Sequence, residues 1–265
     1  MKVISLGAGV QSTTLALMAA YGEIGPMPDC AIFADTGWEP KAVYDHLDKL
    51  KKTLPFPVHI VSSGNIKEDL IIRKDVRGNR FASVPFFTAN GGIGLRQCTR
   101  DYKINPIRSK LRELLGYAPR KRIPPNSVEV WLGISTDEIQ RMKVSRDKWQ
   151  THKWPLIDAR YSRNDCINWL NKNNWSAPKS ACIGCPYHTN TMWRDMRDND
   201  PVSWSDAVFV DHAIRNENSK WQNMRNQMFM HRSLKPLDEV DLSTPAERGQ
   251  IEFGFDQECD GMCGV

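Results

Sequence analysis

The chain has 265 residues, of which 40% are hydrophobic, so it can bury the core of one sizeable α/β domain. It contains no apolar run of about 18 residues, and its first residues enter a strand pattern without the apolar stretch of a secretory signal. We therefore expect a cytoplasmic protein with no membrane span. The formal charge of +5 suits polyanionic ligands such as nucleotides or nucleic acid, although a basic solvated surface would give the same value.

Hydrophobic patterning predicts alternating strands and helices in the first part of the chain. Short apolar runs predict strands at 2–6, 31–34, 58–61 and 128–134. Amphipathic segments predict helices at 12–21, 40–54 and 105–115. Ser135 and Glu138 form a capping-box signature that predicts the start of another helix. This alternation is typical of a twisted parallel sheet with right-handed crossovers and helices on both faces.

The pattern changes near residue 155 and becomes mainly helical. Helical segments are expected at 164–173, around Asp195, at 203–216 and at 219–230. We expect residues 1–155 to form a nucleotide-binding α/β core. Residues 156–265 would form a helical cover with a Cys-X-X-Cys and a cysteine-bearing tail, and the two parts together would make one compact domain.

The turn after the first predicted strand, Gly7 to Ser12, is a candidate phosphate-binding loop. Its small residues allow close approach of the backbone to phosphate, and the helix that follows offers N–H groups and the positive end of its dipole. The hydroxyls of Ser12, Thr13 and Thr14 add donors. Ligands of open parallel sheets bind at the carboxyl ends of strands, so this turn and residues 35–37 should line one crevice. The turn matches neither a Walker loop nor a dinucleotide fingerprint, and such turns also serve packing alone.

Five segments resemble the phosphoadenosine phosphosulfate (PAPS) reductase family, a branch of the PP-loop ATP pyrophosphatase superfamily. Residues 5–12 (Ser-Leu-Gly-Ala-Gly-Val-Gln-Ser) resemble its PP-loop, and residues 33–39 resemble its second-strand motif. Residues 98–107 resemble the Cys…Lys-Ile…Pro segment. Residues 133–141 resemble the motif after the later strand, and residues 154–158 resemble the Pro-Leu segment.

This resemblance extends over roughly the first 190 residues and implies a Rossmann-like adenine nucleotide alpha-hydrolase fold. It implies that an adenine nucleotide (PAPS, adenylylsulfate or ATP) binds on the first loop. The implied nucleotide-binding residues are Ser5, Gly7, Ala8, Gly9, Gln11, Ser12, Thr13, Asp35, Thr36 and Gly37. Trp38 is either a core residue or a flank for the base. The loop lacks the Lys and Asp of ATP-cleaving members, since Val10 and Gln11 replace them, and is closer to the Gly-Ile-Gln version of sulfonucleotide reductases.

Seven cysteines, an odd and clustered set, indicate metal or redox chemistry rather than a disulfide framework. Cys30 and Cys166 lie in apolar surroundings and are expected to be buried structural thiols. Cys182 and Cys185 have the spacing that chelates one metal or two corners of a cluster. The resemblance implies that Cys98 joins them as ligands of a [4Fe–4S] cluster next to the nucleotide.

The fourth cluster ligand is left open by the sequence. Either one iron stays open to bind sulfur, or a tail cysteine completes the set. A zinc site made by Cys182, Cys185, His188 and a tail cysteine is the alternative. The resemblance implies that Arg141 faces an anion, and Lys103, which adjoins Cys98, would hold a phosphate or sulfate, although both also fit a solvated surface.

Three functions follow from these observations. The first is a sulfonucleotide reductase, an oxidoreductase in which Cys259 attacks sulfur and Cys263 resolves the intermediate with a thiol reductant, because the tail resembles the family's Glu-Cys-Gly nucleophile. The second is an ATP-dependent, cluster-assisted sulfurtransferase acting on a nucleic acid, motivated by the net charge and by the basic stretch from Arg73 to Arg100, expected to be a long flexible loop. The third is a non-catalytic nucleotide-binding protein. We also expect a homo-oligomer.

Overall fold

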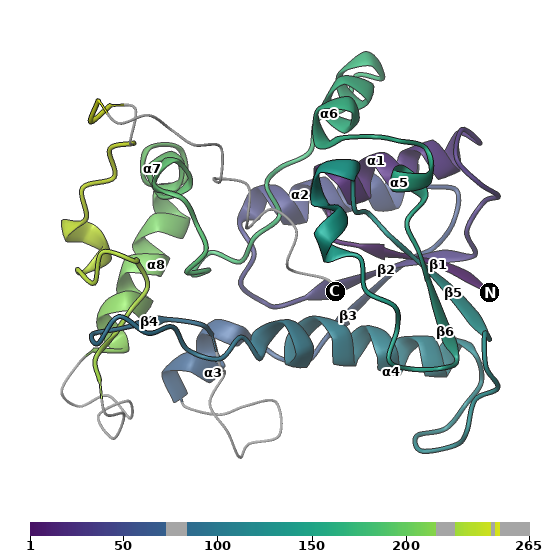
Figure 1. The fold of residues 1–265 in the computed structure, drawn as a ribbon, viewed down its shortest axis with the longest axis horizontal. Helices are drawn as coiled ribbons and strands as arrows, with labels where there is room; N and C mark the ends of the chain where they lie inside the picture. The colour runs from purple at the N-terminus through teal and green to yellow at the C-terminus, as the bar shows by residue number, and fades with distance from the viewer. Residues whose placement is uncertain (73–83, 216–225, 245–246, 250–265) are drawn as a thin grey trace.

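The computed structural model describes residues 1–72, 84–215, 226–244 and 247–249 (Figure 1). Its centre is a five-stranded sheet in which every neighbouring pair is parallel, in the order β3-β2-β1-β5-β6. The strands are β1 Lys2–Leu6, β2 Cys30–Asp35, β3 Val58–Ser62, β5 Val128–Leu132 and β6 Gln150–Lys153. The predicted α/β class with a parallel sheet is confirmed.

Helices cover both faces of this sheet (Figure 1). One face carries α1 Val10–Ala20, α2 Lys41–Thr53, α5 Pro155–Asp158 and α6 Arg163–Lys172, and the other carries α4 Asn105–Leu114. Successive side chains of a strand point to opposite faces. Accordingly, Ile4 belongs to the core beneath α1 and α2, whereas its neighbour Val3 belongs to the core that includes Leu111 of α4.

A third cluster of buried side chains lies beyond the carboxyl ends of the strands (Figure 1). It is built by α3 Ile66–Ile72, α7 Asn190–Asn199, α8 Pro201–Ala213 and a two-stranded antiparallel sheet of β4 Phe87–Thr88 with β7 Met228–Phe229. A π-helix, η1 Thr99–Ile104, leads into α4, and two 3-10 helices, η2 Thr136–Arg141 and η3 Leu237–Glu239, complete the described elements. Trp193 and Tyr102 are the largest side chains fully buried in this cluster.

The expected division near residue 155 does not coincide with a break in packing. Leu156 of α5 and Cys166, Trp169 and Leu170 of α6 belong to the same core as Leu15 of α1. The beginning of the helical cover therefore packs directly on the sheet's helical layer. No helix of the described residues combines the length and the apolar character that a membrane crossing requires.

Two local predictions are wrong. Ser135 gives no side-chain cap, and the segment after it is the 3-10 helix η2, because the Glu138 carboxylate is turned toward Gln11 and Arg141 instead of the helix start. Met228, at the end of a predicted helix, lies in strand β7 because it pairs with Thr88. Residues 216–225 of the predicted helical segments lie outside the described residues.

Candidate nucleotide and thiol site

The strand order places a topological switch point at β1. The chain builds β2 and β3 on one side of β1 and then crosses to β5 on the other side. In open α/β sheets, ligands bind outside the carboxyl ends of strands at such a point. The turn from Gly7 to Gly9 and the turn from Gly133 to Ser135 leave β1 and β5 there, so they are the first two components of a candidate site.

The Gly7–Ser12 turn is a candidate anion cradle. Ala8 adopts a positive φ of 56°, which costs an L-residue about 1 kcal/mol and is typical of functional turns. Gly9 begins α1 and contributes no side-chain cap, so the first amides of the helix are the donors that an anion would satisfy. The Gly7 amide donates to Ser12 Oγ at 3.2 Å, and this hydroxyl donates to the carbonyl of Gly9 at 3.3 Å.

Thr13 and Thr14 do not share this orientation. Thr13 is fully buried, and its hydroxyl lies 2.9 Å from Nε2 of His46 on α2. Burial lowers the pKa of His46 to about 4, so the ring is neutral near pH 7. The hydroxyl of Thr14 donates to the carbonyl of Val10 at 2.9 Å. Of the three expected hydroxyl donors, Ser12 alone hydrogen-bonds with the glycines of the turn.

A polar network joins this loop to the segment after β5. Gln11 Nε2 donates to Glu138 Oε2 at 3.2 Å, and Arg141 Nη1 donates to the same oxygen at 2.5 Å. Arg163 Nη1 donates to Gln11 Oε1 at 3.1 Å. An anion near Arg141 would therefore share this guanidinium with a carboxylate. Glu138 was expected in a helix cap and within the family motif of residues 133–141, and no local signal marks its distant partner Gln11.

The turn after β2 is held by its own side chains. Asp35 Oδ1 accepts from the Gly37 amide and from the Tyr44 hydroxyl, each at 2.8 Å. Burial, with the Asp35 carboxylate, raises the pKa of Tyr44. Gly37 has a φ of 70°, and a Cβ there would lie 3.0 Å from the backbone of Asn65. Ser5, on β1, is partly exposed beside this edge of the sheet.

The segment carrying the Cys-X-X-Cys lies against both turns. Ser180 Oγ donates to the carbonyl oxygen of Gly7. Cys182 Sγ lies 3.4 Å from Thr36 Oγ1 and donates at 3.4 Å to Glu39 Oε1. The segment therefore bridges the carboxyl ends of β1 and β2. Ser180 and Glu39 were not predicted as site residues, because Ser180 belongs to no recognisable motif and Glu39, the last residue of the 33–39 motif, had no expected role.

Trp38 is a core residue rather than a flank for a base. It is 3% exposed, and its indole N–H donates to Asp206 at 2.7 Å. Its carbonyl accepts from the Ile183 amide at 2.9 Å, and a Cβ on Gly184 would lie 2.0 Å from its ring. Trp38 thus packs against the Cys-X-X-Cys segment.

Cys98, Cys182 and Cys185 line one pocket although 84 residues separate the first from the second. Cys98 reaches the pocket because it directly precedes the π-helix η1, and such helices are frequent at functional sites. The pocket walls are mainly apolar and include Trp38, Ile66, Val84, Pro85 and Pro186. Two cations, Arg96 and Lys103, also line it.

A buried ion pair borders this pocket. Lys103 Nζ lies 3.5 Å from Glu39 Oε1, and their side chains are 10% and 1% exposed. The same oxygen accepts from Thr36 Oγ1 at 3.1 Å, whereas Glu39 Oε2 has no hydrogen-bond partner among the described residues. Lys103 is therefore a buried pocket residue and not a solvated surface charge.

The side chains near the pocket differ in how well they match a zinc ion and an iron–sulfur cluster, the two expected metal groups. Within the described residues, no three His, Cys, Asp or Glu side chains are close enough together to hold a single ion. His188, proposed for zinc, is buried with its ring 4.5 Å from that of Trp193, and neither ring nitrogen has a described hydrogen-bond partner. Cysteine thiolates are the usual ligands of a cluster, and the three cysteines line one mainly apolar pocket of about 30 Å³.

The remaining cysteines divide into two groups. Cys30 and Cys166 are buried as predicted, and burial raises their pKa values to about 11 and about 12, which keeps both as thiols. Cys259 and Cys263 lie outside the described residues, as do the four cations from Arg73 to Arg80.

Comparison with known proteins finds similarity among solved structures. No protein-family model matches the chain, and no curated protein matches it. Among solved structures, the chain is similar to phosphoadenylyl-sulfate (PAPS) reductase from Candida auris, a phosphate complex, with a TM-score of 0.44 and 13% sequence identity. The aligned region covers 66% of this chain and 74% of that chain.

Proposed function

We propose that this protein is a PAPS-reductase-like enzyme of sulfur metabolism that binds an adenine nucleotide and reduces a sulfonucleotide beside a cysteine-ligated cluster. The proposal depends mainly on one observation, the bridge that the Cys-X-X-Cys segment makes between two turns. Ser180 contacts Gly7 and Cys182 contacts Thr36, so thiols lie next to the candidate anion cradle. This combination of an anion cradle and thiols is what a reaction on a nucleotide-linked sulfate needs.

The nucleotide phosphate would bind at the start of α1. The uncapped amides after Gly9 and the positive end of the helix dipole favour an anion, and Ser12 can turn its hydroxyl toward it. The turn Asp35–Gly37 would line the adenosine side. Lys103 and Arg141 would orient the sulfate, because both lie at the edges of the pockets next to Cys98.

Cys98, Cys182 and Cys185 would hold the cluster, with a fourth ligand from outside the described residues or an open iron. When bound, a [4Fe–4S] cluster supplies iron that acts as a Lewis acid toward a neighbouring anion. The apolar walls of the pocket would offer water few hydrogen-bond partners at this position. Lys103, paired with Glu39, would place one positive charge beside the thiolates.

The reaction on a sulfonucleotide balances with two thiols. The Cys259 thiolate attacks the sulfate sulfur, the S–O bond to the nucleotide breaks, and the nucleotide phosphate leaves with the electron pair. The product is a cysteine thiosulfonate. A second thiol, Cys263 or an external reductant, then attacks the cysteine sulfur, which releases sulfite and forms a disulfide. The two thiols supply the two electrons that reduce sulfate sulfur to sulfite.

The test combines anaerobic purification with metal analysis and a sulfite assay. We expect absorption of an iron–sulfur cluster, iron and sulfide bound to the chain, and sulfite release from PAPS or adenylylsulfate with a thiol reductant. Cys182→Ser and Cys185→Ser should lose iron and activity, whereas Cys30→Ala, which removes a thiol outside the pocket, should keep both. Wild-type protein without iron would contradict the cluster. Undiminished sulfite release in Cys259→Ser would contradict the tail nucleophile.

A further inference from the structure

Among the described residues, positive charge is concentrated in two short segments. Residues 96–122 contain nine Lys or Arg and two acidic residues, a net charge of +7. Residues 140–148 contain four Lys or Arg and one acidic residue, a net charge of +3. Because the whole chain carries +5, all other residues together carry −5. Such a distribution is an electrostatic footprint for a polyanion, not a uniformly basic surface.

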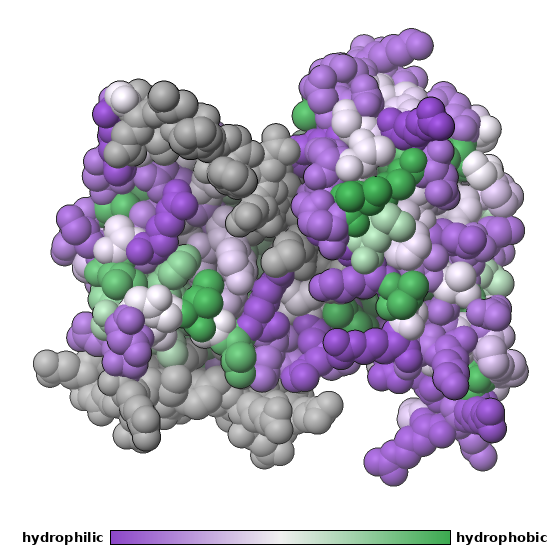
Figure 2. Space-filling view, in the orientation of Figure 1, coloured by the Kyte–Doolittle hydropathy of each residue, from purple (hydrophilic) through white to green (hydrophobic). Residues whose placement is uncertain are grey.

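The two segments form one surface, here called the basic surface. Arg108 of α4 donates to Asp147 at 2.6 Å, which fixes the second segment against the first. A groove of about 290 Å³ between them is lined by Arg96, Thr99, Arg100, Ile104, Gln140, Arg141 and Lys143. Figure 2 shows hydrophilic side chains over the part of the molecule that overlies α4.

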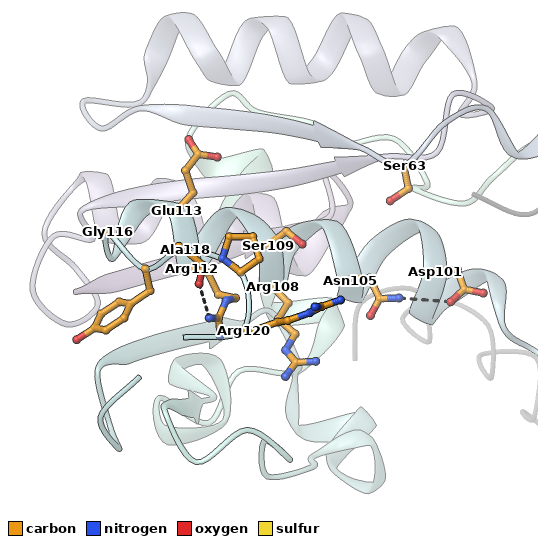
Figure 3. A pocket seen from close by; sticks show the side chains of 12 residues that line it. Ser63, Asp101, Asn105, Arg108, Ser109, Arg112, Glu113, Gly116, Ala118 and Arg120 are labelled. Atoms are coloured by element: carbon orange, nitrogen blue, oxygen red, sulfur yellow. Dashed lines mark hydrogen bonds between the residues drawn. The ribbon is translucent and has the colours of Figure 1, made fainter. Parts of the chain in front are cut away.

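A second, wider groove of about 920 Å³ continues along α4 to the turn that follows it. Figure 3 shows Arg108, Arg112 and Arg120 around it, with Arg112 turned back onto the carbonyl of Ala118. Asp101 and Asn105 line the beginning of this groove. In the sequence of η1 and α4 they directly follow Arg100 and Ile104, which line the first groove. The two grooves therefore follow the same helix.

Several cations of the basic surface have no acidic partner among the described residues. Arg108 is paired with Asp147 and Arg100 with Asp101. In contrast, five exposed cations make no ion pair with a described carboxylate: Arg120, Lys121, Arg122, Lys143 and Arg146. Arg120 is also held in the left-handed region, at a φ of 68°. These five side chains can reach a bound anion without first breaking an internal pair.

The basic surface is continuous with the thiol pocket. Arg96 and Thr99 line both the pocket of the three cysteines and the first basic groove. A chain of phosphates lying in the groove would thus pass the mouth of the pocket. This placement distinguishes the surface from a patch that only improves solubility.

We propose that the basic surface binds the sugar–phosphate backbone of a nucleic acid and leads it past the thiol pocket. The ten residues of α4 extend over about 15 Å, which matches about four successive phosphates of one strand. A free nucleotide is too short to use cations from Arg96 to Arg122. Binding of the nucleic acid does not depend on the proposed reduction of a sulfonucleotide. If both hold, a nucleic acid is a candidate acceptor or regulator of the chemistry at the pocket.

The test measures binding of fluorescein-labelled 30-nucleotide DNA, the same sequence as RNA, and a 30-base-pair DNA duplex by the full-length protein. Two charge-reversal variants remove cations of the basic surface: Lys121→Glu/Arg122→Glu and Lys143→Glu/Arg146→Glu. The matched control is Lys51→Glu/Lys52→Glu, which reverses two exposed charges at the end of α2. Thermal melting confirms that each variant is folded, and sulfite release is measured in parallel.

We expect at least one of the three nucleic acids to bind, with both test variants weakening binding tenfold or more at 50 mM salt. The logarithm of the association constant falls linearly with the logarithm of the salt concentration. The magnitude of this slope should decrease by about 1.4 for a single strand or about 1.8 for a duplex when two phosphate contacts are lost. The control should change the affinity much less. Equal weakening by the control or absence of binding to all three probes would each overturn the proposal. Sulfite release that stays unchanged in the test variants would show that the loss of nucleic-acid binding is independent of the proposed reductase activity.

Discussion

Ser180 donates a hydrogen bond to the carbonyl oxygen of Gly7, a residue 173 positions earlier in the chain. This contact ties the segment before the Cys-X-X-Cys to the turn that begins α1. The two residues link the candidate anion cradle to the segment that carries two of the thiols. The position of the thiols relative to a bound nucleotide therefore depends on this link.

Replacing Ser180 with alanine should weaken both stability and nucleotide binding. Loss of one side-chain hydrogen bond costs about 1 kcal/mol of unfolding free energy. We expect the dissociation constant for the nucleotide to rise severalfold, because the Gly7 carbonyl is no longer held. Ser127→Ala is the matched control, since that hydroxyl also donates to a backbone carbonyl, that of Pro124, away from the site. Urea denaturation and calorimetric titration measure the two effects, and an equal loss of affinity in the control would contradict this role of Ser180.

Substitution of Gly184 by alanine should displace Trp38. The added Cβ would lie 2.0 Å from the Trp38 ring, so the indole or the Cys-X-X-Cys segment must move. Overpacking of this kind costs about 1–3 kcal/mol. The smaller ring in Trp38→Phe should restore part of that loss, although it also removes the hydrogen bond to Asp206. A double-mutant cycle from urea denaturation gives the coupling energy. Strictly additive effects would show that the two side chains do not meet.

The sheet was predictable because its buried strands are continuous apolar runs, as in Ile32 and Phe33 of β2. The edge strand β6, Gln150–Lys153, was missed because its four residues are polar and carry no strand signal. The capping box at Ser135 failed for a different reason. Glu138 has the correct local spacing, but a hydrogen bond to Gln11, 127 residues away, determines its orientation.

The candidate site was predictable only where motifs mark it. The convergence of Cys98 with Cys182 and Cys185 was expected from a family resemblance, and the structure brings the three to one pocket. Thr13 carried the same sequence signal as Ser12, yet its hydroxyl faces His46, because the helix turns it toward α2. Ser180 had no signal at all, since a single serine in a loop specifies no partner.

Stability should fall as the pH drops from 7 to 5, and His46 should account for part of this change. Its pKa is about 4 in the folded protein, against 6.5 for a solvated histidine side chain, so the unfolded state binds more protons between these values. The stabilisation by neutral His46 is present above pH 6.5 and is lost as the pH falls toward 4. For this shift the loss by pH 5 is at most about 2 kcal/mol.

His46→Gln should flatten the pH dependence of the unfolding free energy, even if the variant is less stable at pH 7. His59→Gln, which changes a histidine on strand β3, is the control. Urea denaturation at pH 5, 6 and 7 gives the three slopes. A wild-type pH dependence that is retained in His46→Gln would show that other groups cause it.

Gly133→Ala should move the turn after β5 away from the candidate anion cradle. A Cβ at this position would lie 2.8 Å from both the amide nitrogen and the Cα of Ser12. These are backbone atoms at the start of α1, so they cannot swing aside as a flexible side chain would. We expect the turn after β5 to move away from the helix start, with a loss of about 1–3 kcal/mol in unfolding free energy and a large loss of nucleotide affinity.

Gly7→Ala provides a sharp comparison within the same site. Its Cβ would lie 3.6 Å from Ser12 Oγ, an ordinary contact, and neither Gly7 nor Gly133 has a positive φ. The two substitutions therefore differ in close approach and not in backbone strain. Calorimetric titration of the nucleotide should show a smaller loss of affinity for Gly7→Ala than for Gly133→Ala. Comparable affinities would mean that the contact between the β5 turn and α1 is not what shapes the cradle, and the nucleotide would then have to be sought elsewhere along the carboxyl edge of the sheet.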